Sequence, residues 1–225
     1  MLPGIAPAVN LTGLRAYFGE WKGAVPSASA HTFSSVALGA AAGNRKLVVA
    51  LEAGAGATRT STSITVGGVA MSRVIRASDS AQTNLAEIWE LNTGGTAVES
   101  ATVADVIVTT SGTMSNGMNI ATWSLHNCGT LFDSGRNYST STGASPYPLS
   151  GVDFPARGFV VAVGGAAGDV AFSVDLGLTK VTTGNWFFIA ALHPTAAATG
   201  QTMNMSWSSG SPAQRRLAFA AWSGF

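Results

Sequence analysis

Apolar residues occur along this chain in short runs that are separated by Gly, Ser, Thr, Asn or Pro. These separating residues favour turns, so the pattern is typical of β-strands joined by loops. The Ala-rich stretch 37–42 is too short to form a stable helix alone, and no longer stretch has helical periodicity. The pattern therefore predicts an all-β protein. Strands are expected at 31–38, 45–52, 63–66, 71–76, 84–91, 103–109, 118–125, 158–163, 171–174, 179–182, 186–192, 202–207 and 216–222.

The predicted strands are of two kinds. Where apolar and polar residues alternate, successive side chains point to opposite faces, which places Glu87 and Trp89 on one face and Glu90 on the other. The runs 47–51 (Leu-Val-Val-Ala-Leu) and 159–163 (Phe-Val-Val-Ala-Val) are apolar on both faces. In an antiparallel protein this indicates central strands that are covered by a second layer or by a neighbouring subunit. Three tryptophans at apolar-face positions are expected to be buried: Trp89, Trp123 and Trp222.

A weak internal repeat relates the two halves of the sequence. Three pairs of segments share it: 47–51 with 159–163, 84–85 with 185–186, and 121–124 with 220–223. We interpret residues 31–225 as one antiparallel β-sandwich of jelly-roll type, with half-repeats at 31–125 and 150–225 joined by a loop at 133–150. Chance similarity is the alternative in a chain so rich in Ala, Gly and Ser.

Residues 1–30 fall outside this scheme, because Pro and Gly recur there between large apolar side chains. This composition differs from that of a polar disordered tail. It predicts an extended N-terminal anchoring arm that has no strand-rich fold of its own and is buried by another chain. The expected anchors of this assembly arm are Leu14, Tyr17, Phe18 and Trp21.

Residues 133–150 are rich in Ser, Thr, Gly and Pro, and this composition predicts a long exposed loop. The loop carries a cation, an amide and two phenol rings, in Arg136, Asn137, Tyr138 and Tyr147. Such groups supply stacking and directional hydrogen bonds, so they are the candidate surface for binding. A simple hinge between the half-domains is the alternative.

The composition favours an assembled protein. Charged residues make up only 10% of the chain, against about 25% in an ordinary soluble domain, and the formal net charge is +1. A surface poor in Lys and Glu is readily buried against neighbours, which indicates a homo-oligomer or a part of a larger assembly. The lack of a basic stripe argues against nucleic-acid binding. Membrane insertion and export by a signal peptide are not expected either, since no suitable apolar segment occurs.

Few titratable groups are placed for catalysis. The three histidines lie in different strands, and the Gly-x-Ser-x-Gly turn of a hydrolase is missing. Glu87 and Glu90 are faintly similar to the carboxylates of jelly-roll glucanases, but opposite faces of a strand cannot share one cleft, so edge or rim glutamates are expected. The Asp residues are scattered singly, and the one cysteine, Cys128, is expected to be buried and inert. We therefore predict no catalytic residue, no metal and no cofactor.

Six segments have a recognisable layout: Phe33-Ser-Ser-Val-Ala-Leu-Gly39, Ala42-Gly-Asn-Arg45, Leu47-Val-Val49, Ile64-Thr-Val-Gly-Gly-Val69, Ala86-Glu-Ile-Trp89 and Ala121-Thr-Trp123. This layout resembles a family of small β-rich proteins that are encoded among the structural genes of tailed phages and prophages. The resemblance is good over about residues 31–125 and loose over the remainder. It implies a virion part, such as a capsid decoration, head-fibre or tail-associated protein. It brings no catalytic residues with it.

Together these features predict a non-enzymatic structural component of a phage virion, made in the host cytoplasm and released by lysis. The expected partners are other virion proteins of the capsid or tail, further copies of the chain, and a host-surface glycan. The first alternative is a carbohydrate-binding module or lectin-like adhesin. The second is a β-sandwich glycan hydrolase that uses Glu87 or Glu90.

Overall fold

The computed structural model describes residues 13–26, 28–55, 57–78, 83–167, 171–181 and 186–225. Within these ranges the regular elements are all β-strands, and they form four antiparallel sheets. The all-β, antiparallel fold predicted from the apolar pattern is confirmed. The described ranges contain no helix that is long and apolar enough to cross a membrane.

The first half of the chain forms two facing sheets. Sheet A contains, in spatial order, β1 (Arg15–Ala24), β9 (Gly117–His126), β3 (Lys46–Gly54), β7 (Asn84–Asn92) and β6 (Ser72–Ser78). Sheet B contains, in spatial order, β2 (Ala30–Ala37), β8 (Val103–Thr110), β4 (Ser61–Val66) and β5 (Val69–Ala70). The side chains between the two sheets form a first hydrophobic core, in which Leu51, Ile64 and Val106 are fully buried.

The second half also forms two facing sheets. Sheet C contains, in spatial order, β10 (Cys128–Ser139), β17 (Ala213–Gly224), β12 (Phe159–Ala167), β15 (Phe187–Leu192) and β14 (Thr179–Lys180). Sheet D contains, in spatial order, β11 (Tyr147–Phe154), β16 (Ala198–Trp207) and β13 (Phe172–Val174). Phe188, Met203 and Phe219 belong to the second core, between sheets C and D.

The strand orders of the two halves correspond. In sheet C, β10, β17, β12, β15 and β14 follow one another as β1, β9, β3, β7 and β6 do in sheet A. In sheet D, β11, β16 and β13 follow one another as β2, β8 and β4 do in sheet B. The chain therefore takes the same path twice between an inner and an outer sheet.

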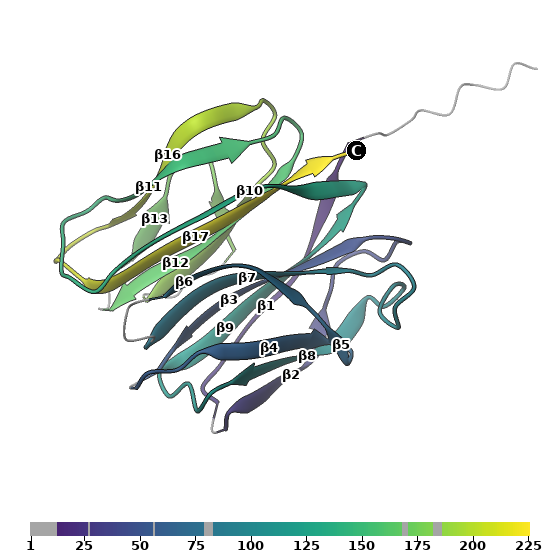
Figure 1. Cartoon of the computed structure of the whole chain (residues 1–225), viewed down its shortest axis with the longest axis horizontal. Coiled ribbons are helices and arrows are strands. Elements are labelled where there is room, and N and C mark those ends of the chain that lie inside the picture. Colours follow the sequence, from purple (N-terminus) through teal and green to yellow (C-terminus); the bar gives the residue numbers. More distant parts are fainter. Residues whose placement is uncertain (1–12, 27, 56, 79–82, 168–170, 182–185) are drawn as a thin grey trace, which may run out of the picture.

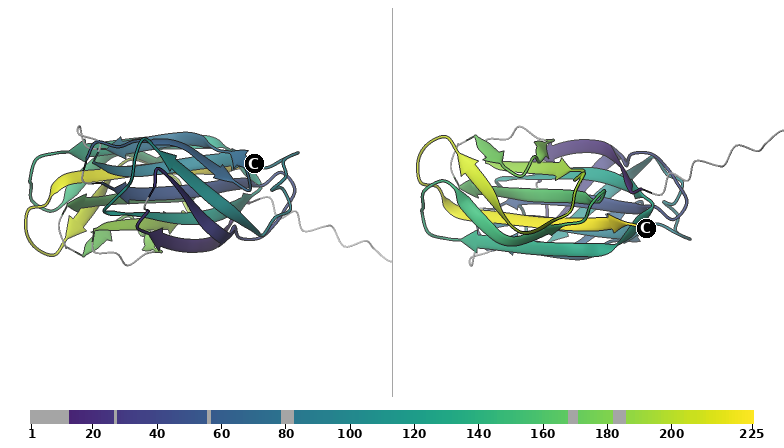
Figure 2. Two further views of the ribbon diagram at one scale, coloured as in Figure 1. Left: turned by 90° about the horizontal axis from the view of Figure 1, so that it is seen from below. Right: turned by 90° about the horizontal axis from the view of Figure 1, so that it is seen from above.

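Sheets A and C pack against each other, so the four sheets are stacked in the order B, A, C, D (Figure 1). A third hydrophobic core fills the space between A and C, and it includes Val48, Trp123, Phe159 and Trp222. Figure 2 shows from two further sides that the stack is an elongated body. We call the boundary between sheets A and C the seam.

The seam explains the strands that are apolar on both faces. All nine residues of β3 are buried: Leu47 and Val49 face the first core, whereas Val48 and Ala50 face the seam. The covering layer predicted from the sequence is confirmed, and it is the other half of the same chain. Trp89, Trp123 and Trp222 are buried as expected, with 4%, 2% and 0% of their surface exposed.

The strand registers show which positions of the two inner sheets correspond. Trp123 of β9 pairs with Val48 of β3, and Trp222 of β17 pairs with Phe159 of β12. Val48 and Phe159 both face the seam, whereas Leu47 faces the first core. In the internal repeat inferred from the sequence, Leu47 corresponds to Phe159. That alignment is therefore one residue out of register with the structure.

The predicted strand-free arm over residues 1–30 is wrong in its described part. Arg15–Ala24 form β1, which pairs with β9 along the edge of sheet A. This strand is integral to the sheet, because its backbone hydrogen bonds complete those of β9. The first 12 residues of the predicted arm lie outside the described residues.

The predicted long loop over residues 133–150 is also wrong. β10 continues to Ser139 and β11 begins at Tyr147, so the connection between them covers only 140–146. The residues 133–139 are paired with β17. Pairing with a buried neighbouring strand outweighs the low strand propensity of their Ser, Gly and Asn residues.

Candidate functional site

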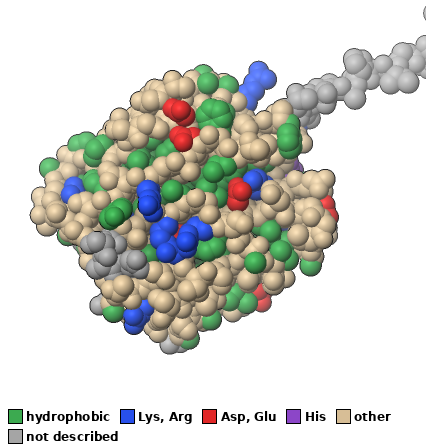
Figure 3. All heavy atoms as spheres, viewed as in Figure 1, with side chains coloured by type: hydrophobic (Ala, Val, Ile, Leu, Met, Phe, Trp, Pro, Cys, Tyr) green, Lys and Arg blue, Asp and Glu red, His purple; other side chains and the backbone are tan. Residues whose placement is uncertain are grey.

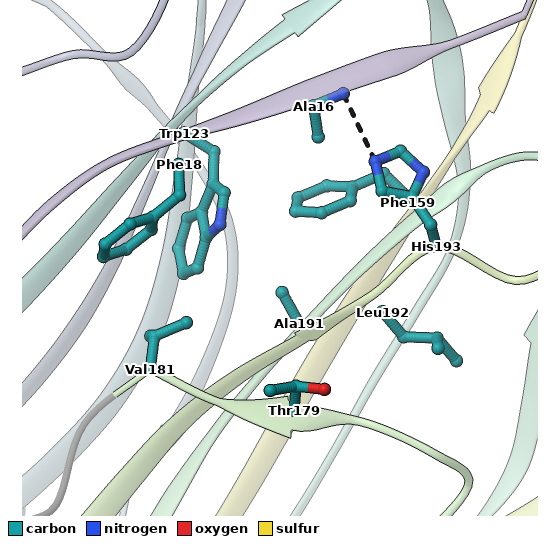
Figure 4. Close-up of a pocket in the computed structure, with 9 residues that line it drawn as sticks. All are labelled: Ala16, Phe18, Trp123, Phe159, Thr179, Val181, Ala191, Leu192 and His193. Atoms are coloured by element: carbon teal, nitrogen blue, oxygen red, sulfur yellow. Dashed lines mark hydrogen bonds between the residues drawn. The ribbon is translucent and has the colours of Figure 1, made fainter.

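The seam opens at the edge where β1 and β14 lie, and there it forms a pocket of about 210 Å³ (Figure 4). Side chains from β1, β9 and β12 line one part of this pocket, and side chains from β14 and β15 line the rest. Most of the lining is apolar. A pocket of this kind is suited to a flat apolar group rather than to a charged one.

Four aromatic rings from both halves form a continuous wall of this pocket. Phe18 contacts Trp123 edge-on, with 5.7 Å between the ring centroids. Trp123 lies 6.0 Å from Phe159, and Phe159 lies 5.1 Å from the His193 ring. Phe18 reaches this wall because it pairs with Trp123 in the ladder, and paired residues of antiparallel strands share a face.

The two ring nitrogens of His193 form hydrogen bonds with backbone groups of different halves. The Ala16 N–H donates to Nε2 over 3.3 Å, and Nδ1 lies 2.9 Å from the Gly158 carbonyl oxygen. Because Nε2 accepts, Nδ1 is the nitrogen that donates, to the Gly158 carbonyl oxygen. The ring is thus held by a backbone group of each half and is a structural part of the wall.

The seam is closed at the position in sheet C that corresponds to Trp123. Trp222 is fully buried there, and its Nε1 donates to Glu90 over 2.7 Å. Glu90 also forms an ion pair with Lys46 at 2.8 Å. The two halves therefore differ at this position: Trp123 lines an open pocket, whereas Trp222 is fully buried.

Two large aromatic side chains of β1 are exposed, and one of them, Phe18, lines this pocket. Phe18 has 47% of its surface exposed and Trp21 has 41%. Trp21 pairs with Ala121, which belongs to the seam core, so both aromatics lie on the face of β1 that points toward sheet C. Among the described residues, the edge strand of sheet C, β14, contains two residues, whereas β1 contains ten.

The four predicted arm residues have different environments. Leu14 is buried in the seam core, so the expectation that another chain buries it is wrong. Tyr17 packs on the His126 ring, with 4.6 Å between the centroids. Only Phe18 and Trp21 remain largely exposed.

The four residues of the predicted loop do not form one exposed cluster. Arg136 Nη1 donates to the Arg76 carbonyl over 2.8 Å, and Asn137 Nδ2 donates to the Pro148 carbonyl over 2.6 Å. Tyr138 is 46% exposed on β10.

Tyr147, the fourth of these residues, is buried with 5% of its surface exposed. Its ring lies 4.8 Å from the Arg215 guanidinium carbon, and burial raises the pKa of its hydroxyl to about 12. Its phenol ring is therefore core rather than ligand-contact surface.

Glu87 and Glu90 lie on opposite faces of β7, as their spacing predicted. Glu87 is fully buried, forms an ion pair with Arg76, and accepts hydrogen bonds from Ser61 Oγ at 2.6 Å and Trp89 Nε1 at 2.7 Å. The expected rim position is wrong for Glu87, because β7 lies between two other strands. The two carboxylates therefore face different cores and share no cleft.

Cys128 is buried, as expected, and burial raises the pKa of its thiol to about 12. In the described part of the chain, no group of three or more His, Cys, Asp or Glu side chains could hold a metal ion.

Sequence reasoning missed the lining residues Phe159 and His193. Both residues lie in apolar, strand-like stretches of the sequence. The apolar–polar pattern of a strand is the same whether a residue lines a pocket or lies in a core, so the sequence did not mark these two as pocket residues. The pocket brings β1 together with β14 and β15, which is a relation between distant segments.

No protein-family model matches the chain, and no curated protein matches it in sequence.

Proposed function

We propose that this chain is a non-enzymatic structural component of a tailed-phage particle, such as a capsid decoration, head-fibre or tail-associated protein. The observation that carries the proposal is the exposed aromatic pair on edge strand β1. Phe18 and Trp21 expose 47% and 41% of their surfaces, and Phe18 also lines an apolar pocket. Contiguous exposed apolar groups on an unpaired strand edge are typical of a contact surface for another chain.

The non-enzymatic part of the proposal is supported by the carboxylates. Each of the nine carboxylates in the described part of the chain has a structural partner. Glu52, Glu87 and Glu90 are in ion pairs inside the molecule. The others accept hydrogen bonds, most of them from backbone amides: Glu20, Glu99, Asp105, Asp133, Asp153 and Asp175. General acid–base catalysis needs carboxyl groups within reach of a substrate.

The surface also supports a place in an assembly. Figure 3 shows one face of the molecule, on which charged side chains are few and uncharged groups cover most of the area. Surfaces that are poor in charge lose little hydration when a neighbour covers them.

We further propose that each half is a jelly roll. In a jelly roll the chain alternates between two facing sheets, and its first and last strands are neighbours. The strand orders support this: β1 lies next to β9 in sheet A, and β10 lies next to β17 in sheet C. The matching order of the remaining strands supports a duplicated unit.

The proposal is tested with tailed particles purified from the strain that encodes the chain. We expect mass spectrometry to recover the chain among the major particle proteins. A Phe18→Ser/Trp21→Ser variant should fold but fail to enter the particle, because the contact surface has become polar. Phe132→Ser, at another exposed aromatic on β10, is the control and should enter normally. Particles that lack the wild-type chain would refute the proposal.

A further inference from the structure

A second pocket on the seam has different chemistry from the first. It encloses about 110 Å³, and carboxamide side chains from both halves line it. Asn84, Asn116 and Asn119 come from the first half, and Gln214 comes from the second. Gly54 lies between them: a Cβ there would come within 2.9 Å of Asn84 Oδ1, so the glycine preserves the space.

Hydrogen bonds hold three of these carboxamides in place, and two of the bonds cross the seam. Asn84 Nδ2 donates to Gln214 Oε1 over 2.7 Å, and Gln214 Nε2 donates to Thr83 Oγ1 over 3.1 Å. Asn119 Nδ2 donates to Glu52 Oε2 over 3.2 Å. A carboxamide has two N–H donors and two oxygen lone pairs, so each group keeps hydrogen-bonding capacity for a ligand.

Glu52 and Arg216 add a buried ion pair whose charges cancel. They expose 4% and 1% of their surfaces, and both line the pocket. The lining therefore has no net charge. A charged ligand would be buried without a counter-charge, whereas a neutral polar ligand would not incur that cost.

Trp186 lies at this pocket with 54% of its surface exposed. Exposed indole rings provide a flat apolar face on which ring-shaped ligands stack. The combination of a stacking face with fixed carboxamides distinguishes this pocket from a simple water-filled gap between strands.

We propose that this pocket binds one sugar ring of a neutral glycan, with the sugar hydroxyls on the carboxamides and its C–H face on Trp186. A hydroxyl both donates and accepts, as a carboxamide does, so the two groups are complementary. A water molecule occupies about 30 Å³, so the pocket has room for about three or four hydroxyl-sized groups. That volume matches the hydroxyl groups along one edge of a sugar ring. None of the residues that line this pocket belongs to β1, so the inference goes beyond the assembly role.

The test uses the full chain and a panel of methyl glycosides. The neutral members are galactoside, glucoside, mannoside, fucoside and N-acetylglucosaminide, and the charged members are glucuronate, sialate and glucosamine. Saturation-transfer NMR detects binding, and calorimetric titration measures the affinity. We expect binding of at least one neutral member, with none for the charged ones.

Two surface variants connect the binding to the pocket. Trp186→Ala and Asn116→Ala should each weaken the affinity by about tenfold, since each removes one direct contact. Phe132→Ala, at an exposed aromatic on β10 that does not line the pocket, is the control and should bind normally. Circular dichroism checks that all three variants are folded. The proposal is overturned by a panel in which no neutral member binds, by preferred binding of a charged member, or by unchanged affinity in both pocket variants. None of these results bears on whether the chain enters a particle.

Discussion

At the scale of single residues, the few charged side chains stabilise the interior. Glu87 is the clearest example, because it lies in the first core and contacts Arg76, Ser61 and Trp89. A buried carboxylate is tolerated when a counter-charge and hydrogen-bond donors surround it. Because the Glu87 side chain is fully buried, its carboxylate is not accessible to a substrate in solution.

We expect Glu87→Gln to lower the free energy of unfolding by about 3 kcal/mol, because it leaves the Arg76 guanidinium without its counter-charge. Glu20→Gln is the matched control. Glu20 pairs with Lys22 at 3.5 Å near the surface, where such pairs contribute about 1 kcal/mol or less. Urea unfolding followed by tryptophan fluorescence measures both variants. Equal effects would contradict the structural role of Glu87.

Burial raises the pKa of both Cys128 and Tyr147 to about 12, from ordinary values of 9.0 and 10.0. A raised folded-state pKa means that folding favours the neutral form. The stabilisation is complete below the unfolded pKa and is lost as the pH rises toward the folded one. We therefore expect the contribution of these two groups to the free energy of unfolding to be constant below about pH 9 and to fall between about pH 9 and 12.

Tyr147→Phe separates the two contributions to this alkaline loss. The variant should lose less stability between about pH 10 and 12, and it should be at least as stable as the wild type at neutral pH. The buried Tyr147 hydroxyl has no hydrogen-bond partner among the described residues, so its removal breaks no hydrogen bond there. Tyr138→Phe, at an exposed tyrosine whose charge contributes less than burial to the raised pKa of Tyr147, should change the alkaline profile less than Tyr147→Phe does.

At the scale of elements, the sequence predicted the central strands better than the edge strands. The runs in β3, β7, β9 and β17 have strong apolar signals, and strands were expected there. β1 was missed because Gly19 and Gly23 interrupt it and appear as turn residues. A Cβ on Gly19 would collide with the Ala37 carbonyl oxygen and Thr122 Oγ1, so this glycine permits close packing within a strand.

Neither pocket could be predicted from the sequence. Phe18 and His193 line the same pocket because β1 and the residue after β15 lie opposite each other across the seam. Asn84 and Gln214 meet for the same reason at the other pocket. Local patterns report which face of a strand is apolar, but they do not report which distant strand covers that face.

We expect removal of residues 1–24 to prevent folding of the first half. This truncation deletes β1, exposes the edge of β9 and removes Leu14 from the seam core. Removal of residues 1–12 keeps each of these contacts and is the control. Circular dichroism and size-exclusion chromatography compare the two products. A folded, monomeric protein that lacks β1 would show that the strand is dispensable.

At the scale of the whole molecule, the seam joins the halves into one cooperative unit. Its core contains Trp123 and Trp222, and the ion pairs Lys46–Glu90 and Glu52–Arg216 lie at its borders. The second of these pairs joins one half to the other. Interfaces that are as apolar as a core resemble the interior of one domain rather than a contact between two independent ones.

We expect thermal unfolding in a single transition, with the same midpoint by circular dichroism and by tryptophan fluorescence. Residues 13–126 produced alone should aggregate, because the seam face of sheet A would be open to solvent. Trp222→Ala should lower the free energy of unfolding by about 3–5 kcal/mol and keep the transition single. Two separate transitions in the intact chain would contradict this view of the seam.

The central position of β17 has a consequence for synthesis on the ribosome. β17 lies between β10 and β12, so sheet C stays incomplete until the last strand has emerged. Sheet A is complete once β9, which ends at His126, has left the ribosome. At about 5–20 residues per second, the next hundred or so residues take on the order of ten seconds. During that interval the nascent chain presents one finished sandwich with a bare apolar face, which is the stage at which a chaperone would engage it.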